Sequence, residues 1–244
     1  MDTGSDKHFF HRYTDFYERC FSKLGPVQEV FEFGVLRGAS IRWLQNRFAT
    51  ARIVGADILP EQSEWPRDPR IEYRRVDQAH RNSIVKAFDD LDRTYDLIIE
   101  DGSHIPEHQA SCLILGFQRL NSGGMYVLED IHTSRPDHPY SAKHPRGTPN
   151  CLCVLLALQH LEETGEQLTH DVVGKLCHPK FFAPADIEFL AREVASFELF
   201  QRTALPLRCY ACGSSKFRYN DYRCVCGVDI YFGAESMSFV LTRA

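Results

Sequence analysis

Two short apolar segments of this chain each end in acidic residues. The first, 97–99, leads into Glu100-Asp101-Gly102-Ser103-His104, and the second, 125–128, leads into Glu129-Asp130. Ligands of an open parallel sheet bind outside the carboxyl ends of its strands, so these acids are expected to converge. Asp101, Glu129 and Asp130 offer the hard oxygen ligands that suit Mg²⁺, and a hydroxyl bound to such a cation loses its proton more easily.

His104 is the predicted general base for that hydroxyl, because it lies three residues after Asp101 and an ordinary histidine has a near-neutral pKa. A simpler interpretation stays open, in which the acids are solvated turns and His104 caps the helix that begins near Pro106. Two consecutive strands with the same chemistry favour the metal site. His108, His132 and the histidines of the loop that follows compete with His104 for the role of base.

A glycine turn lies upstream of these acids. The segment Glu32-Phe33-Gly34-Val35-Leu36-Arg37-Gly38 follows an apolar run and precedes a predicted helix from Ser40, an arrangement that holds nucleotide-like cofactors in such sheets. The glycine spacing lacks the G-x-G-x-x-G pattern that lets backbone approach a pyrophosphate. Glu32 suits a cofactor with an ammonium or sulfonium group better than one with phosphates. We therefore predict Glu32, Gly34, Gly38 and Ser40 as cofactor-binding residues.

The next strands also end in polar residues. Asp57 lies roughly twenty residues past the turn, the distance at which a carboxylate meets ribose hydroxyls. Asp77-Gln78 ends the third strand and is predicted to meet the cofactor base, and Asp101 completes the predicted cofactor contacts. The alternative is that the glycines only pack a helix and that Asp57 and Asp77 are solvated. Three acidic ends on consecutive strands favour the cofactor site.

Strands alternate with helices through most of the chain. Apolar periodicity predicts strands at 30–33, 53–58, 71–76, 95–99, 125–128, 197–204 and 237–241. It predicts helices at 8–24, 40–48, 81–91, 107–120, 151–163 and 186–195. This alternation is typical of an α/β fold with a doubly wound, mostly parallel sheet. The long polar loop 131–147, rich in Pro and His, is predicted to be a substrate lid.

Composition excludes several classes of protein. The 244 residues are 43% hydrophobic and 25% charged, enough to bury a sizeable core in one domain with additions. A formal charge of −5 argues against a dedicated nucleic-acid binder, which needs clustered Lys and Arg. Neither a run of 18 apolar residues nor a signal peptide is present, so we expect a cytoplasmic protein without a membrane partner.

Four of the nine cysteines cluster near the C-terminus. Cys209, Cys212, Cys224 and Cys226 form the pattern C-x2-C-x11-C-x-C, which resembles the two knuckles of a small structural zinc ribbon. The second knuckle has one spacer residue where two are usual, and redox-labile thiols or a chance cluster are the alternative. The other cysteines are predicted to be small apolar fillers, namely Cys20, Cys112, Cys151, Cys153 and Cys177.

The predicted organisation has four parts. A helical leader covers 1–26, the main domain 27–208, the ribbon-like insertion 209–227 and the final strand 228–244. Tyr13 and Tyr17 lie four residues apart and share a helix face, so with His132 they are candidate substrate contacts. An aromatic stripe buried against the sheet is the alternative for the two tyrosines.

These motifs resemble class I S-adenosylmethionine-dependent methyltransferases. More narrowly, Asp101-Gly102-Ser103-His104 with Glu129-Asp130 is similar to the metal-dependent sugar O-methyltransferases of macrolides and related natural products. The leader residues Ser5-Asp6-Lys7, His11-Arg12-Tyr13-Thr14 and Tyr17 are also similar to that family, whose pattern has no zinc ribbon. The resemblance covers about residues 5 to 135.

The resemblance implies a seven-stranded Rossmann-like methyltransferase sheet, with S-adenosylmethionine and Mg²⁺ as cofactors. It implies Asp101, Glu129 and Asp130 as metal ligands, with Asp101 and His104 as catalytic residues. A small-molecule glycoside is the implied acceptor, as in antibiotic biosynthesis, and a homo-oligomer the implied assembly. The catechol-type O-methyltransferases are a close alternative, because vicinal oxygens of a catechol chelate Mg²⁺ in the same way.

Two further classes are considered. An NAD-dependent oxidoreductase is disfavoured by the missing third glycine and by Glu32 close to where a pyrophosphate would sit. A non-catalytic protein that docks through the zinc ribbon would show no cofactor-dependent turnover.

Overall fold

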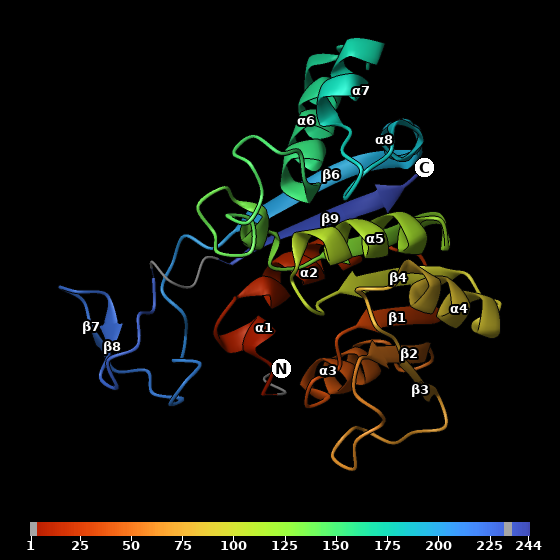
Figure 1. Ribbon diagram of the computed structural model, residues 1–244. Coiled ribbons are helices and arrows are strands. Elements are labelled where there is room, and N and C mark those ends of the chain that lie inside the picture. The colour runs from red at the N-terminus through yellow and green to blue at the C-terminus, as the bar shows by residue number, and fades with distance from the viewer. Residues whose placement is uncertain (1–3, 232–235) are drawn as a thin grey trace.

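The computed structural model describes residues 4–231 and 236–244, so the predicted segments 1–26 and 228–244 each include residues outside the description. A single seven-stranded sheet in the order β3-β2-β1-β4-β5-β9-β6 runs through these residues (Figure 1). Its strands are β1 Glu29–Phe33, β2 Arg52–Asp57, β3 Ile71–Arg75, β4 Tyr95–Glu100, β5 Leu120–Leu128, β6 Val194–Gln201 and β9 Met237–Arg243. The first five are parallel, and β9 pairs antiparallel with both β5 and β6. The predicted doubly wound, mostly parallel sheet is confirmed.

Helices cover both faces of the sheet. They are α1 Asp6–Phe9, α2 Tyr13–Phe21, α3 Ala39–Arg47, α4 Arg81–Leu91, α5 Pro106–Phe117, α6 Cys151–Thr164, α7 His170–Leu176 and α8 Pro184–Glu193. One buried cluster joins α2 and α3 to one face, and a second joins α4, α5, α6, α7 and α8 to the other (Figure 1).

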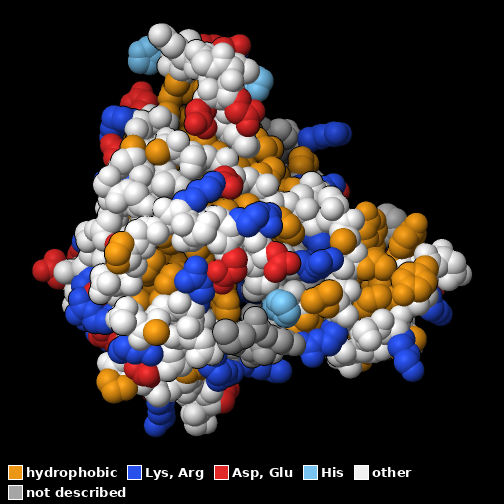
Figure 2. Space-filling view, turned by 180° about the vertical axis from the view of Figure 1, so that it is seen from behind, with side chains coloured by type: hydrophobic (Ala, Val, Ile, Leu, Met, Phe, Trp, Pro, Cys, Tyr) orange, Lys and Arg blue, Asp and Glu red, His pale blue; other side chains and the backbone are white. Residues whose placement is uncertain are grey.

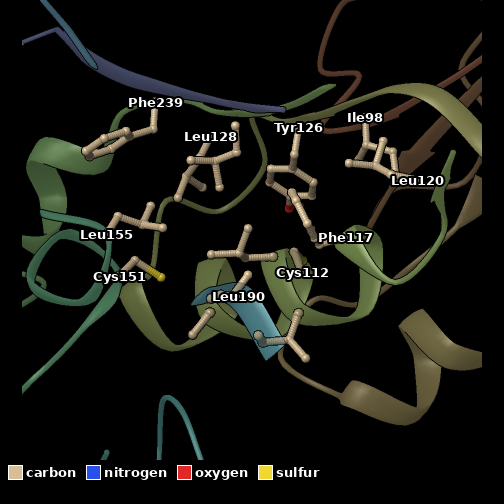
Figure 3. Packing of buried hydrophobic residues seen from close by; sticks show 14 of the residues in the cluster. Ile98, Cys112, Phe117, Leu120, Tyr126, Leu128, Cys151, Leu155, Leu190 and Phe239 are labelled. Carbon is tan, nitrogen blue, oxygen red and sulfur yellow. The ribbon is translucent and has the colours of Figure 1, made fainter. Parts of the chain in front are cut away.

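Alternation along the strands divides the core between the two faces. In β5, Tyr126 and Leu128 belong to the cluster under α5, whereas Met125 and Val127 belong to the cluster under α2 and α3. Figure 3 shows Tyr126 and Leu128 facing the side chains of α5, with Leu155 and Phe239 beside them. A strand that buries both faces reads as a continuous apolar run, as 125–128 does.

The structure corrects two predicted elements, the leader helix and the strand at 197–204, and adds a helix. The leader is two helices, because Arg12 adopts a left-handed conformation with φ of 61° and turns the chain between them. The short helix α7 was not predicted. Strand β6 begins at Val194 and ends at Gln201, so residues 194–195 belong to the strand and 202–204 lie beyond it.

The cysteine prediction also needs one correction. Cys20, Cys112 and Cys151 are buried as expected of apolar fillers, and Cys177 is half-buried, but Cys153 is exposed on α6. No helix within the described ranges combines the length and apolar character needed to cross a membrane.

Candidate active site

The acidic residues predicted from the sequence come together beyond the carboxyl ends of β4 and β5. Asp101 follows β4 and its N–H donates to the carbonyl of Phe33 in β1 at 2.9 Å. The N–H of Glu129 donates to the carbonyl of Glu100 at 2.9 Å, so both turns continue the sheet for one residue. In these two turns His104 and Asp130 have positive φ angles of 55° and 51°, a backbone conformation that few non-glycine residues adopt.

Asp101, His104 and Asp130 form the centre of the candidate site. One ligand atom from each lies within 4.8 Å of the others. The Nε2 of His104 is 3.9 Å from an oxygen of Asp101 and 3.8 Å from an oxygen of Asp130, too far for direct hydrogen bonds. Although burial opposes protonation, the carboxylates of Asp130 and Asp101 raise the pKa of His104 above its usual value.

Glu129, the third predicted magnesium ligand, forms an ion pair with a buried lysine, Lys7. The ammonium group of Lys7 lies 2.7 Å from its carboxylate, pairs directly with Asp101 and is 3.7 Å from Glu32. Lys7 is almost fully buried. Burial alone would lower the pKa of Lys7, but the three carboxylates raise it well above its usual value. A fixed cation therefore already compensates part of the negative charge at this edge.

Lys7 is the residue that the sequence reasoning missed as part of the site. It stands in the leader segment that carries the family resemblance, and that is the signal by which it could have been found. His11 was missed in the same way, and its Nδ1 is 3.6 Å from Asp130.

Asp130 is surrounded by hydrogen-bonding and cationic groups. Tyr13 donates its hydroxyl hydrogen to the carboxylate at 2.6 Å, and His132 lies 3.9 Å away. Burial opposes ionisation of Asp130, yet His11, His104 and His132 lower its pKa to about 2. Burial lowers the pKa of His132 to about 4. Asp130 is therefore an anion at neutral pH.

The two candidate substrate tyrosines are both fully buried. Tyr17 shares a hydrogen bond of 2.9 Å with Ser238 of β9 and stacks between Tyr13 and Phe21. The two tyrosines thus form a buried aromatic stripe, the alternative considered in the sequence analysis. Only Tyr13 of the two bonds to a residue of the acidic cluster, through its hydroxyl and Asp130.

The glycine turn is shaped by the packing of the protein itself. A Cβ atom at Gly34, whose φ is 90°, would collide with the backbone oxygen of Asp101, and one at Gly38, whose φ is 72°, would collide with Pro66. Ser40 donates its hydroxyl hydrogen to Glu32. Burial raises the pKa of Glu32 to about 7, against the opposing charge of Lys7. The turn thus brings β1 and β4 into direct backbone contact at the site.

The other predicted cofactor residues line the same edge. Asp57 accepts hydrogen bonds from the N–H groups of Val35 and Leu36 at 2.8 and 3.0 Å, so it braces the turn. Gln78 donates to Glu100 at 2.8 Å and accepts from the N–H of Ser103 at 2.8 Å, tying β3 to the loop that carries His104.

The side chain of Asp77 bonds within the turn that follows β3. It accepts a hydrogen bond from the N–H of Ala79 at 3.0 Å, and its side chain is about half-buried.

The four cysteines of the second predicted metal site also come together. Their sulfur atoms all lie within 4.8 Å of one another, with 3.8 Å between Cys209 and Cys226 and 3.5 Å between Cys212 and Cys224. The cluster lies in the excursion between β6 and β9, beside the small strands β7 Phe217–Arg218 and β8 Arg223–Cys224. We call residues 205–231 the cysteine module.

The cysteine module projects from the main body as a separate lobe whose exposed side chains include many apolar ones (Figure 2). The exposed apolar residues are Leu207, Tyr210, Tyr219, Tyr222, Val225 and Tyr231.

Comparison with known proteins finds methyltransferases among the similar sequences and structures. Residues 31–131 match a family model described as a methyltransferase domain. The chain is 34% identical over 139 residues to the 8-demethyl-8-alpha-L-rhamnosyl tetracenomycin-C 2'-O-methyltransferase of Streptomyces olivaceus, covering 54% of this chain and 36% of that one. It is 30% identical over 148 residues to the L-olivosyl-oleandolide 3-O-methyltransferase of Streptomyces antibioticus, covering 56% and 38%. The matched part is therefore little more than a third of each relative.

Solved structures share the fold. The MycE methyltransferase of the mycinamycin pathway, in complex with Mg and SAH, superposes with a TM-score of 0.61 at 24% identity over 79% of this chain and 47% of that one. A complex of the same enzyme that also holds mycinamycin VI gives a TM-score of 0.60 at 19% identity.

Residues 31–131 thus match the sequence pattern of a methyltransferase domain. Over about half of its length the chain is also similar to natural-product sugar O-methyltransferases, as its motifs indicated.

Proposed function

We propose that this chain is an S-adenosylmethionine- and Mg²⁺-dependent O-methyltransferase that acts on a sugar hydroxyl of a glycosylated natural product. The observation that carries the proposal is the convergence of Asp101, His104 and Asp130 at the carboxyl ends of two adjacent strands. The similarity to sugar O-methyltransferases over about half of the chain supports it.

The donor set suits a hard divalent cation. Asp101 and Asp130 present carboxylate oxygens that do not bond directly to the Nε2 of His104, and both side chains retain some exposure to solvent. Lys7 pairs with both Asp101 and Glu129, but Glu129 is almost fully buried. We therefore assign the ion mainly to Asp101 and Asp130, with Glu129 as a third ligand on their flank. When bound, Mg²⁺ would stabilise negative charge on the acceptor oxygen.

Apolar side chains at the end of β2 suit the nucleoside part of the cofactor. Leu36, Ile58 and Leu59 are 70%, 57% and 44% exposed, and all three lie around Asp57. Exposed apolar groups beside a carboxylate are typical of a site that takes a flat apolar base and ribose hydroxyls. We assign Asp57 to the ribose, Gln78 and Asp77 to the base side, and Glu32 with Ser40 to the amino-acid end.

His104 is the proposed proton acceptor. Methyl transfer from a sulfonium to a hydroxyl oxygen breaks one C–S bond, forms one C–O bond and releases one proton. The two flanking carboxylates orient the imidazole and strengthen it as a base. Tyr13 and His132 hold Asp130 in place, so the chain contributes orientation and charge more than covalent chemistry.

The loop 131–147 helps to form a cavity of about 250 Å³ that we assign to the part of the acceptor outside the reacting sugar. It is lined by Ser134, four residues beyond Asp130, and by His144, Leu152, Leu156 and Phe181. The hydroxyl of Ser134 is buried without a hydrogen-bond partner among the described residues. Filling the cavity with Leu156→Trp should raise the KM for the acceptor severalfold and leave the KM for S-adenosylmethionine unchanged, whereas Val85→Trp on α4 should change neither.

The cysteine module is proposed to bind one structural Zn²⁺. Four thiolates at these separations can close a tetrahedral site and leave no position open for catalysis. The metal content of the purified protein tests this assignment directly.

The proposed activity is tested by incubating the protein with labelled S-adenosylmethionine and two panels of acceptors, rhamnosyl or olivosyl glycosides and catechols, with and without Mg²⁺. Label transferred to a glycoside only when Mg²⁺ is present is the expected result. Transfer to catechols alone would assign the chain to the catechol-type O-methyltransferases. If S-adenosylhomocysteine failed to stabilise the protein against heat, that result would contradict any methyltransferase activity.

A further inference from the structure

The cysteine module contacts the leader helix α1 through residues that flank its first cysteine. The N–H groups of Leu207 and Arg208 both donate to the carbonyl of Phe9, at 2.7 and 3.3 Å. The ring of Tyr210 meets that of Phe10 edge-on, with 4.9 Å between centroids. Figure 1 shows the module beside α1, on the side away from α3.

The same short helix supplies Lys7 to the candidate active site. Lys7 lies two residues before Phe9, and its ammonium group is enclosed by Asp101, Glu129 and Glu32. With four residues, α1 is too short to be stable without tertiary contacts. Its position therefore depends on tertiary contacts with the carboxylates around Lys7, with the module, and with α2, where Nδ1 of His8 lies 2.9 Å from the hydroxyl of Thr14.

The module in turn has little apolar material with which to fold. Its buried cluster consists of Cys209, Cys224 and Ile230, so two of its three members are themselves candidate metal ligands. Its sheet has two strands of two residues each. An isolated hairpin of this size is at best marginally stable in water. Small modules of this type gain their folding free energy from the bound metal.

We propose that the cysteine module is a metal-dependent support for the leader, which holds α1 so that Lys7 stays inserted between Asp101 and Glu129. The proposal rests on zinc binding by the four cysteines, and it assigns to that structural ion a positioning role for the proposed methyltransferase site. Lys7 is the positioning residue through which the module acts.

Hydrogen exchange of the α1 amides tests the proposal without any measurement of turnover. The reporters are the N–H groups of Phe10 and His11, which donate to the carbonyl of Asp6 at 2.9 and 2.8 Å. Removing zinc with a chelator, with Mg²⁺ then restored in excess, should make these amides exchange at least tenfold faster, and added zinc sulfate should reverse the change. Cys212→Ser should reproduce the zinc-free protein.

A matched pair of tyrosine variants separates the contact from the metal site. Tyr210→Ala keeps all four cysteines but removes the ring on Phe10, so it should speed α1 exchange about tenfold at unchanged zinc content. Tyr219→Ala removes a 71% exposed ring of the same module and should leave α1 exchange unchanged.

Unchanged α1 exchange in both the zinc-free protein and Tyr210→Ala would overturn the proposal, as would equal effects of the two tyrosine variants. A wild-type protein that transfers no methyl group but shows the expected exchange pattern would contradict only the proposed function.

Discussion

The two candidate metal sites of this protein are built in opposite ways. The acidic edge draws Asp101, His104 and Asp130 from turns after two adjacent strands, with a buried lysine beside them. The cysteine module draws its four ligands from two turns within 18 residues of chain, 209–226. A site with mixed donors and neighbouring space can exchange ligands during a reaction, whereas a closed set of thiolates can only hold structure. The two donor sets therefore favour a catalytic role for a metal at the acidic edge and a structural role for one in the cysteine module.

The largest expected difference between the two sites is their response to chelation. A brief treatment with EDTA should abolish methyl transfer, and Mg²⁺ alone should restore it, because the acidic edge is open to solvent on one side. Zinc measured in the same sample should remain bound. Loss of activity that only zinc restores would reverse the roles assigned to the two sites.

The next largest effect is expected for the proposed base. His104→Ala should lower kcat by about 10²- to 10⁴-fold while S-adenosylhomocysteine still stabilises the protein against heat. His108→Ala is the matched control, because His108 shares a hydrogen bond of 2.9 Å with Ser103 and does not face the carboxylate pair. Equal losses in the two variants would remove His104 from its role.

Lys7→Met tests how far the acidic edge depends on its fixed cation. The variant leaves the buried Glu32 and Glu129 and the half-buried Asp101 without their partner, which should cost about 3 to 5 kcal/mol of unfolding free energy. Lys23→Met removes an exposed surface pair with Glu198 at 2.5 Å and should cost far less, because solvent screens such pairs. Urea unfolding of both variants measures the difference, and similar values would show that the buried lysine is dispensable.

The smallest effect is expected in the cysteine module. Cys226 is exposed, so Cys226→His has room for the larger ring and should retain zinc, since three cysteines and one histidine also close a tetrahedral site. Methyl transfer should stay within about twofold of the wild-type rate. A variant that lost zinc and yet kept full activity would separate the module from the site altogether.

Local patterns predicted most of the fold and the positions of both ligand clusters. The apolar runs of β1, β4 and β5 and the four cysteines carry their signals within a few residues, and parallel strands bring their carboxyl ends to one edge. What escaped prediction depends on distant contacts. Lys7 reaches Asp101 across 94 residues, and apart from the family resemblance of the leader segment no local pattern predicts three carboxylates around it.

The leader shows the same limit. Its apolar spacing predicted one helix over 8–24, yet the chain turns at Arg12 so that α1 supplies Lys7 and α2 supplies Tyr13 to the same site. Asp57 was predicted from its distance to the glycine turn. Its hydrogen bonds to Val35 and Leu36 give it a bracing role that spacing alone does not reveal.

Strands β6 and β9 pair directly up to Gln201 and Met237, the last residue of one and the first of the other. The intervening excursion therefore departs from the sheet and rejoins it at a single point. A chain with this topology can gain or lose such a lobe by a single insertion or deletion, without any change in the order of the strands. A protein with a plain hairpin at this point would need only a new anchor for its N-terminal segment to become dependent on such a lobe.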